Sequence, residues 1–466
     1  MVCTNCISGN FIAFLHSLFI GREFTKGYSN CGAIEHADNW IPTVEAVEDS
    51  PGENNMKTFI KIAGILLTIA LLGAMFHLRA LKNLHLKDQY PDRRSNFFTF
   101  WLSGYMVLKG ENPYDQTQYL AGHDAFGVTW KPNRIFPYPL PLSLFMVPLG
   151  LLPFSKSYYL WQIISQIIIV ITVFVLLEHW KEPAHSRLLT PLMVFFLFFG
   201  PVYLTLQVGS IGAFTLLIML ISLLFFEKGL SLPAGAILSL TILKPPQGFT
   251  ILLLAGLWFL ARKDWKAIQG VIFGGFAILI TGMIEDPLWI IKFREASQAV
   301  MNRTLGIHSN VWAYSYLLCS GSSPCATILG GMGALTLLGL GGYFLWRNHA
   351  QLSAWEAFNI IIPIGFVSTI YLWAYDQILY VIPIVLIVST LVERKKSYIQ
   401  AFIFLVVLAF ASLTATILHA YTQKDVWNLG TTVIVLGMAL QLYHLKQDYP
   451  IDKGIAWTQK IHQSSS

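Results

Sequence analysis

Long hydrophobic runs constrain this chain more than any other feature. A helix needs about 20 predominantly apolar residues to cross a bilayer. Of the 466 residues, 55% are hydrophobic and only 12% are charged, whereas soluble proteins average roughly 25% charged residues. The chain is therefore predicted to be an all-α polytopic membrane protein. The strong candidate spans are 59–78, 157–178, 188–206, 208–226, 266–284, 326–346, 355–372, 376–392, 398–419 and 427–445.

The segments between these runs predict the topology. Two shorter runs, 230–243 and 248–262, flank Lys244-Pro245-Pro246-Gln247 and bring the predicted count to twelve. Lys and Arg residues fall on alternate short loops, which marks those loops as cytoplasmic. Both termini are then cytoplasmic. Residues 139–152 are too short and too rich in proline to cross, so we predict a re-entrant or interfacial segment on the outer side.

The hydropathy pattern divides the chain into three parts. Residues 1–55 are interpreted as a poorly ordered N-terminal extension, with a cytoplasmic tail as the alternative. Residues 56–446 form the membrane-embedded domain, whose first outer loop covers 79–156. Residues 447–466 are predicted to be a cytoplasmic tail. Long ordered loops tend to be functional, so the first outer loop is a candidate site.

Cysteines and basic clusters exclude some functions. Cys3 and Cys6 form a C-x-x-C with Cys31 downstream, but no fourth ligand completes a zinc set, so no metal site is expected. Cys319 and Cys325 flank a Ser/Gly-rich loop predicted to lie outside, where either a small disulfide or two free thiols are compatible with the sequence. The basic clusters are short and lie between spans, so no nucleic-acid partner is expected.

Polar stretches that interrupt the apolar sequence fall on the predicted outer face. Such groups are costly at membrane depth and commonly mark functional sites. Their shared side predicts a single extracytoplasmic site. The stretches are the 79–156 loop, Gln207–Ser210, Lys244–Gln247, the 285–325 loop and Trp373–Gln377.

Several short motifs follow one another in a recognisable order and spacing. They are Asn96-Phe97, Asn112-Pro113-Tyr114-Asp115, Tyr138-Pro139, Gly209-Ser210, Lys244-Pro245 and Asn302-Arg303-Thr304-Leu305. In these motifs the chain resembles glycosyltransferase family 87, also called DUF2029, within the GT-C superfamily. The resemblance extends over residues 59–445.

The resemblance implies a fold and an activity. The expected fold is a GT-C-like bundle of about twelve transmembrane helices with a long structured first extracytoplasmic loop. The expected activity is transfer of a sugar, a hexose such as mannose, from a polyprenyl-phosphate donor to an extracytoplasmic lipid or glycan acceptor, with inversion at the anomeric carbon. The expected partners are the polyprenyl-phosphate sugar, this acceptor and membrane lipids. No cofactor is expected, because the lipid-linked sugar is a substrate.

One position departs from the family pattern. The first-loop aspartate of the family, its expected catalytic base, falls on Asn96, and an amide cannot accept a proton at useful strength. We expect the base to have moved to Asp92, four residues earlier; altered or lost activity is the alternative. Asp115 is a further catalytic candidate, although Asn-Pro-Tyr-Asp is also typical of a turn.

Other residues are candidates for binding the substrates. Lys244 is the first candidate for the donor phosphate, because an unpaired ammonium between apolar runs would be costly; snorkelling to the surface is the alternative. Arg303 and His308 are further phosphate candidates, with a surface role as the alternative. The predicted substrate-binding residues are Tyr114, Tyr138, Tyr375, Asp376 and Gln377. Interfacial belts also contain tyrosines, and Asp376 could instead cap a helix.

Two rival functions fit parts of the sequence. A transporter or flippase of a lipid-linked saccharide would also have broken helices and polar residues at membrane depth, but the Lys244-Pro245 break has no convincing repeat in the other half of the chain. The second rival is a non-catalytic relative, which Asn96 would explain.

Overall fold

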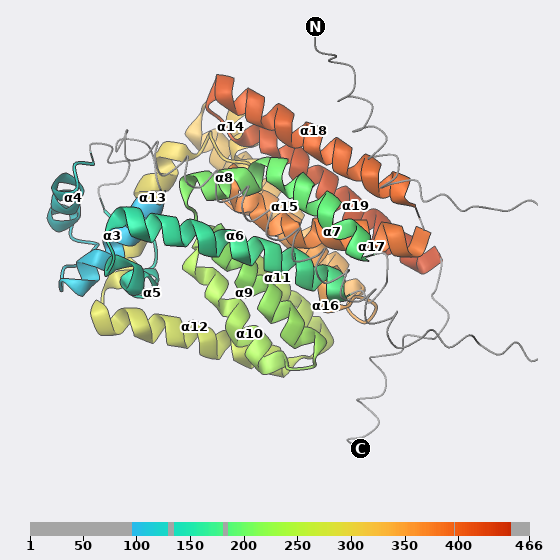
Figure 1. The fold of residues 1–466 in the computed structure, drawn as a ribbon, viewed down its shortest axis with the longest axis horizontal. Coiled ribbons are helices and arrows are strands. Elements are labelled where there is room, and N and C mark those ends of the chain that lie inside the picture. The colour runs from blue at the N-terminus through green and yellow to red at the C-terminus, as the bar shows by residue number, and fades with distance from the viewer. Residues whose placement is uncertain (1–95, 129–134, 180–184, 396, 449–466) are drawn as a thin grey trace, which may run out of the picture. The chain divides into compact units, whose positions relative to one another are not determined.

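The computed structural model describes residues 96–128, 135–179, 185–395 and 397–448. The described residues all belong to one compact unit of the chain. Within the described ranges the regular elements are all helices (Figure 1). This confirms the all-α prediction for that part of the chain.

Six described helices are long and apolar enough to cross a membrane. A seventh crossing is formed if α7 (His185–Phe198) and α8 (Gly200–Val208), which meet at a 61° bend, count as one broken span. These six helices correspond to six of the predicted spans, and the bent pair corresponds to the predicted span 188–206. The six are α6 (Phe154–His179), α12 (Trp265–Glu285), α15 (Ser323–Arg347), η2 (Ala374–Tyr380) with α17 (Val381–Lys395), α18 (Tyr398–Thr422) and η3 (Val426–Asn428) with α19 (Leu429–Asp448).

Several predicted spans form shorter helices. The runs 208–226, 230–243 and 355–372 each give an apolar helix below the 18-residue length of a candidate span, and 59–78 lies outside the described residues. The count of twelve therefore stays a prediction. The shorter elements are α9 (Gly212–Glu227), α10 (Ser231–Ser239) with η1 (Leu240–Leu243), and α16 (Ala354–Ser368); α11 (Pro245–Arg262) covers the predicted run 248–262.

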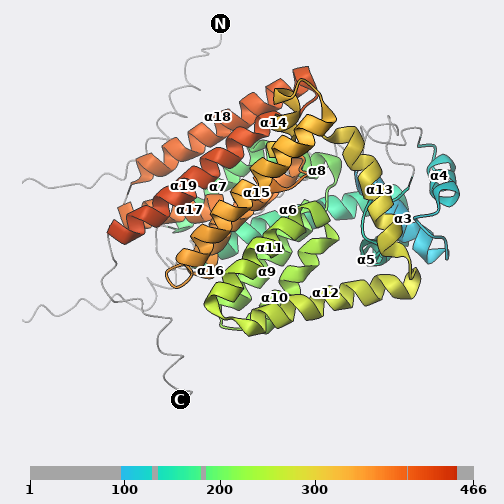
Figure 2. The same cartoon turned by 180° about the vertical axis from the view of Figure 1, so that it is seen from behind.

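Burial separates central helices from peripheral ones. In the η2–α17 span, 89% of the hydrophobic window is buried, against 22% in α12 and 28% in α15 and α18. The outer faces of these three helices expose large apolar side chains, among them Ile284, Leu335 and Phe410. Exposed apolar surface of this extent suits contact with lipid. Figures 1 and 2 show α18 and α19 side by side, and α10 packs along α12.

The described part of the segment predicted to be the first outer loop is folded. It contains α3 (Asn96–Leu108), α4 (Gln116–Ala125) and α5 (Leu140–Gly150), and α3 packs against α5. Phe97 of α3 lies among the rings of Tyr158 and Trp161 of α6, at centroid distances of 5.5 and 5.4 Å. The 11 residues of α5 span only about 16 Å, too short to cross a bilayer.

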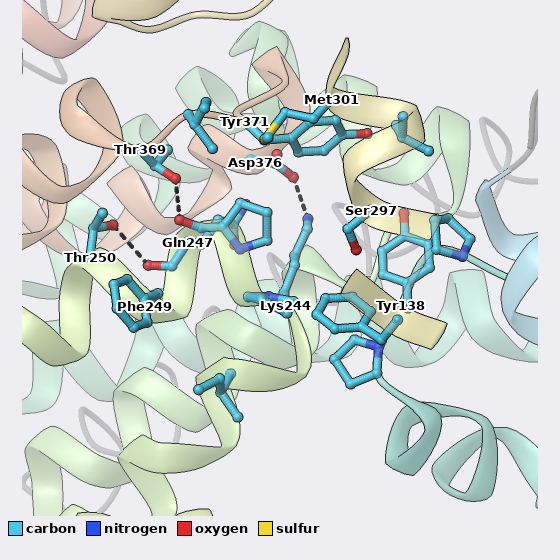
Figure 3. A pocket seen from close by; sticks show the side chains of 18 of the residues that line it. Tyr138, Lys244, Gln247, Phe249, Thr250, Ser297, Met301, Thr369, Tyr371 and Asp376 are labelled. Atoms are coloured by element: carbon cyan, nitrogen blue, oxygen red, sulfur yellow. Dashed lines mark hydrogen bonds and ion pairs between the residues drawn. The ribbon is translucent and has the colours of Figure 1, made fainter. Parts of the chain in front are cut away.

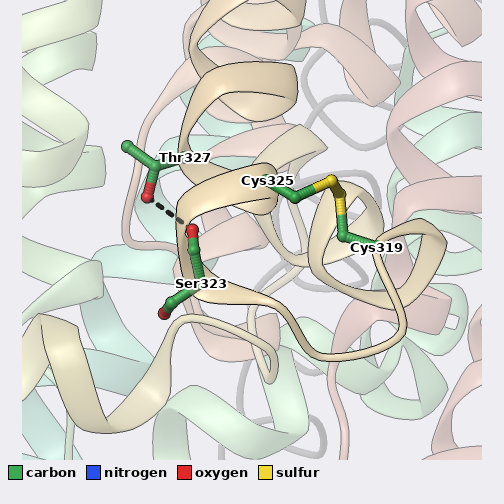
Figure 4. The surroundings of a disulfide bond; sticks show 4 residues. All are labelled: Cys319, Ser323, Cys325 and Thr327. Carbon is green, nitrogen blue, oxygen red and sulfur yellow. Dashed lines mark hydrogen bonds between the residues drawn. A yellow bond between two sulfur atoms is a disulfide. The ribbon is translucent and has the colours of Figure 1, made fainter.

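Helices also replace most of the predicted 285–325 loop. They are α13 (Trp289–Thr304) and α14 (Val311–Leu318). A disulfide joins Cys319, directly after α14, to Cys325 in the first turn of α15 (Figure 4). The disulfide alternative left open by the sequence is therefore the one that the structure contains.

Candidate functional site

A cavity of about 610 Å³ lies where the predicted polar stretches meet. Its walls come from α11, α12 and α13, together with residues 137–139 and 368–376. Most of the wall is apolar, and the polar groups gather around Lys244 (Figure 3). We therefore call it the Lys244 cavity. The apolar wall includes Ile242, Phe249, Ile278, Leu279, Trp289, Ile290, Phe293, Val300 and Met301.

The sequence Lys244-Pro245-Pro246 explains why a lysine lies at this position. Steric clash with a proline ring disfavours helical torsions in the preceding residue, and Lys244 has φ −121° and ψ 75°. The chain therefore breaks between η1 and α11, and proline at the first helical position suits the start of α11. The break leaves Lys244 as the N-cap residue of α11, where its side chain is 7% exposed.

The buried ammonium of Lys244 has specific partners. It forms an ion pair with Asp376 Oδ1 and donates to Ser210 Oγ at 3.1 Å. The Tyr375 ring lies 5.1 Å from Nζ, in cation–π range. An ammonium has three donors, so these two hydrogen bonds leave one N–H available at the cavity.

Local turns bring Asp376 and Ser210 to the lysine. The second carboxylate oxygen of Asp376 accepts from the Trp373 backbone N–H at 2.9 Å, which holds the first turn of η2. Gly209 ends α8 with φ +65°, a conformation that favours glycine. A Cβ there would also lie 2.6 Å from the Phe97 Cβ atom. The tight turn at Gly209 thus directs Ser210 toward Lys244.

Tyrosines surround the ion pair. Tyr138, Tyr371 and Tyr375 all line the cavity. The Tyr138 ring packs edge-on against Phe100 of α3 at 4.8 Å. Asn96, at the start of α3, lies within hydrogen-bonding reach of the Tyr375 hydroxyl. The structure therefore brings Asn96, Tyr138, Lys244, Tyr375 and Asp376 close together.

The Asn112-Pro113-Tyr114-Asp115 motif supports the cavity from outside. Asp115 is exposed and caps α4 by accepting from the Gln118 N–H at 2.9 Å. Tyr114 is buried and donates its hydroxyl to the Tyr138 carbonyl oxygen at 2.5 Å. Neither residue lines the cavity. The position of Asp115 matches its turn alternative, and Tyr114 holds the backbone of Tyr138, which does line the cavity.

The α12–α13 connection holds the same motif. Asn112 Nδ2 donates to Asp286 Oδ2 at 2.7 Å, and Lys292 Nζ lies 2.6 Å from that oxygen. Burial by itself raises the pKa of Asp286, but the hydrogen bonds from Lys292 and Asn112 outweigh it and hold the pKa below its ordinary value. Asp286 is thus a charged anchor between the Asn112-Pro113-Tyr114-Asp115 motif and the start of α13.

Three other predicted residues do not line the cavity. Arg303 is exposed on α13, and its Nε donates to the Ala299 carbonyl within the helix. His308 is fully buried behind the cavity wall, with its ring 4.4 Å from that of Tyr371 and its Nε2 atom 2.9 Å from Thr304 Oγ1. Gln377 points toward α19 and η3, where its amide donates to the Asn428 carbonyl at 3.1 Å. Asp92 lies outside the described residues.

The structure adds cavity residues that the sequence did not single out. Ser297, Ser368 and Tyr371 line the cavity, as does Gln247, which the sequence named only as the end of the polar stretch Lys244–Gln247. A helical period could have indicated Ser297, because Trp289, Phe293 and Ser297 recur every fourth residue of α13. Ser368 and Tyr371 follow an apolar run and resemble an ordinary helix end. Among the described residues, no three or more His, Cys, Asp or Glu side chains are grouped to hold a metal ion.

Comparison with known proteins identifies the family. A family model described as glycosyltransferase family 87 matches residues 136–377, just over half of the chain. The chain belongs to glycosyltransferase family 87. Membership indicates that the protein is a glycosyltransferase. No curated protein and no solved structure matches the chain significantly.

The glycosyltransferase match covers the part of the chain that builds the cavity. Tyr138, Lys244 and Asp376 fall inside it, whereas Asn96, Tyr114 and Asp115 precede it. The resemblance noted in the sequence is therefore confirmed for the family. The polar end of the Lys244 cavity lies within the segment that identifies a glycosyltransferase.

Proposed function

We propose that the protein transfers a hexose such as mannose from a polyprenyl-phosphate donor to an extracytoplasmic lipid or glycan acceptor, with inversion at the anomeric carbon. The observation that carries the proposal is the buried Lys244–Asp376 pair at the polar end of a largely apolar cavity. A ligand with an anionic head and a long apolar tail fits this combination, because the pair can bind the head and the apolar wall can cover the tail.

Lys244 is the proposed phosphate ligand. Two of its three donors are directed to Asp376 and Ser210, so the third can donate to a phosphate oxygen. A cation fixed in a water-poor site stabilises charge that develops on the leaving phosphate. Arg303 and His308, which lie away from the cavity, have no part in this proposal.

Asp376 is the proposed proton acceptor. It is the one acidic side chain among the described residues that line the cavity. In the proposed step the acceptor hydroxyl oxygen forms a bond to the anomeric carbon while the bond from that carbon to the phosphate oxygen breaks. The electron pair leaves with the phosphate, and the hydroxyl proton moves to Asp376. Asp92, the residue expected from the sequence, is the second candidate for this role.

The cavity is proposed to open on the extracytoplasmic side. Trp312, at the start of α14, donates to the carbonyl oxygen of Ser368 in the cavity wall, and Cys319 directly follows the same helix. The disulfide thus lies at the end of an eight-residue helix, about 12 Å long, whose first turn contacts the wall. Disulfides persist in oxidising compartments, which supports an extracytoplasmic position for this end.

Basic residues at the opposite helix ends agree with this orientation. The helix α11 begins at the cavity and ends at Arg262, whose guanidinium donates to the carbonyl oxygens of His349 and Leu352 just after α15. The ends of α11 and α15 therefore meet. Arg262, Lys263 and Arg347 gather there, as expected for a cytoplasmic face.

An assay of bond cleavage tests the proposed function. Purified protein is incubated with radiolabelled polyprenyl-phosphate mannose and a lipid acceptor, and released polyprenyl phosphate and labelled product are measured. We expect both products in equal amounts, and loss of both in Lys244→Met but not in Lys228→Met, which alters an exposed lysine at the end of α9. Movement of intact donor across sealed vesicles without cleavage would identify a transporter instead, and absence of both would identify a non-catalytic relative.

The same assay distinguishes the two candidate bases. We expect Asp376→Asn to lower turnover by at least about a hundredfold while Asp92→Asn retains it. The reverse result would assign the proton acceptor to Asp92. Undiminished turnover in both variants would exclude both carboxylates.

A further inference from the structure

Three polar side chains line the Lys244 cavity without a hydrogen-bond partner among the described residues. Neither amide atom of Gln247 has a partner, and the hydroxyls of Ser297 and Ser368 have none. Gln247 is 1% exposed and Ser368 is 3% exposed. Buried polar groups are nearly always paired, so three unpaired groups around one cavity point to a ligand that pairs them.

The three groups line the same cavity as the ammonium of Lys244. They come from α11, α13 and α16, three walls of the same cavity. In Figure 3 the Gln247 and Ser297 side chains lie on opposite sides of Lys244. The Gln247 side chain also approaches the Asp376 carboxylate, without a hydrogen bond of standard geometry. A ligand held by Lys244 would therefore present its neighbouring atoms to these side chains.

The chemistry of the unpaired atoms selects the ligand. A glutamine amide offers two donors and an acceptor oxygen, and each serine hydroxyl both donates and accepts. A polyprenyl chain offers neither function, and an ionised phosphate only accepts. A ring carrying several hydroxyl groups offers donors and acceptors at several points, as this arrangement requires.

We propose that Gln247, Ser297 and Ser368 form a sugar-hydroxyl subsite that determines which sugar the protein accepts. The inference rests on the proposed function, since it takes Lys244 as the ligand of the phosphate. The subsite binds the sugar attached to that phosphate. Sites that hydrogen-bond a hydroxyl discriminate strongly against analogues that lack it, because the buried partner is then left unpaired.

Binding of two lipids without any acceptor tests the subsite. Dissociation constants are measured from tryptophan fluorescence for polyprenyl phosphate and for the same lipid carrying a sugar. Mannose and glucose are both tried on the wild-type protein, and the sugar that gives the lower Kd is used for the variants. We expect Gln247→Leu and Ser368→Ala to raise the Kd of the sugar-bearing lipid about five- to tenfold for each hydrogen bond lost. The Kd of polyprenyl phosphate should change less than about twofold.

Matched controls separate the subsite from general effects of burial. Gln166 and Ser389 are also buried with an unpaired side-chain atom, but neither lines the cavity. Gln166→Leu and Ser389→Ala should change neither Kd. Ser368→Ala removes a single oxygen atom, so it keeps the test valid if Gln247→Leu does not fold.

Two results would overturn the subsite. One is an equal loss of affinity for both lipids in variants whose melting temperature is unchanged. The other is an effect of the variants on only the KM of the acceptor in the transfer assay. That result would show that Gln247, Ser297 and Ser368 bind the acceptor rather than the sugar of the donor. If the wild-type protein binds neither lipid, the proposed function fails and the subsite fails with it.

Discussion

The Lys244 side chain is stable in its buried position only as part of a pair. Ion pairs removed from water carry a large desolvation cost, and deleting one partner leaves an uncompensated charge. We therefore expect Lys244→Met to lower the free energy of unfolding by about 3–5 kcal/mol, as measured by thermal unfolding in detergent. The double variant Lys244→Met with Asp376→Leu should recover much of this loss and stay inactive. Additive destabilisation in the double variant would show that the two side chains are not coupled.

His308 makes stability depend on pH. Burial lowers the pKa of its imidazole from 6.5 to about 3. Between pH 6.5 and about pH 3 the His308 imidazole is protonated in the unfolded chain but neutral in the folded protein. The free energy of unfolding is therefore unaffected by this histidine above pH 6.5 and decreases as the pH falls toward 3. The expected slope is about 1.4 kcal/mol per pH unit within this window.

A comparison of wild-type and His308→Gln proteins checks the histidine. Unfolding free energies are measured at pH 7.5 and pH 5, and the wild-type protein should lose about 2 kcal/mol more than the variant. His308 packs against Tyr371 and Trp373 rather than in the cavity, so a smaller overall stability of the variant is also expected. An identical pH dependence in both proteins would contradict the assignment.

At the scale of elements, close packing of α10 on α12 holds one wall of the cavity. A Cβ on Gly270 of α12 would lie 2.1 Å from the Leu232 carbonyl oxygen of α10, whereas a Cβ on Gly256 of α11 would meet nothing within 4 Å. We expect Gly270→Ala to lower stability by about 1–3 kcal/mol and Gly256→Ala to leave it unchanged or raise it by up to about 1 kcal/mol. Equal melting temperatures for the two variants would show that the helices separate without cost.

The helix break at Lys244 was predictable because its cause is local. Two prolines after a lysine dictate the backbone there, and the long apolar runs dictate six of the spans. The sequence also identified Ser210, Lys244 and Asp376 as polar residues in apolar surroundings. It could not show that Lys244 and Asp376 pair, because they are 132 residues apart and only the packing of α8, α11 and η2 brings them together.

The position of Arg303 outside the cavity has a structural cause. The sequence placed Arg303 in a loop, but α13 is a helix, so its residues divide between a cavity face and an exposed face. Trp289, Phe293 and Ser297 lie on the first and Arg303 on the second. His308 follows the end of that helix and is buried in the connection to α14. Asp115 likewise caps a helix that the turn motif alone did not predict. The sequence did not show on which face of these short helices each side chain lies, and that face decides whether the residue reaches the cavity.

At the scale of the whole molecule, sidedness links the cavity to the topology. In a chain whose native cysteines are replaced by serine, a single cysteine at Ser322 should react with a membrane-impermeant maleimide in intact cells. A single cysteine at Lys263, near the opposite ends of α11 and α15, should react only after permeabilisation. The opposite pattern would invert the proposed orientation and move the cavity to the cytoplasmic side.

The proposed function requires that the Lys244 cavity bind a polyprenyl-phosphate head at the Lys244–Asp376 pair. The most direct measurement is an electron cryomicroscopy structure of the protein in lipid nanodiscs with polyprenyl phosphate. We expect phosphate density within hydrogen-bonding distance of Lys244 Nζ, with the polyprenyl chain along the apolar wall formed by α11, α12 and α13. Phosphate density elsewhere, with the cavity filled by protein side chains or ordinary bilayer lipid, would contradict it.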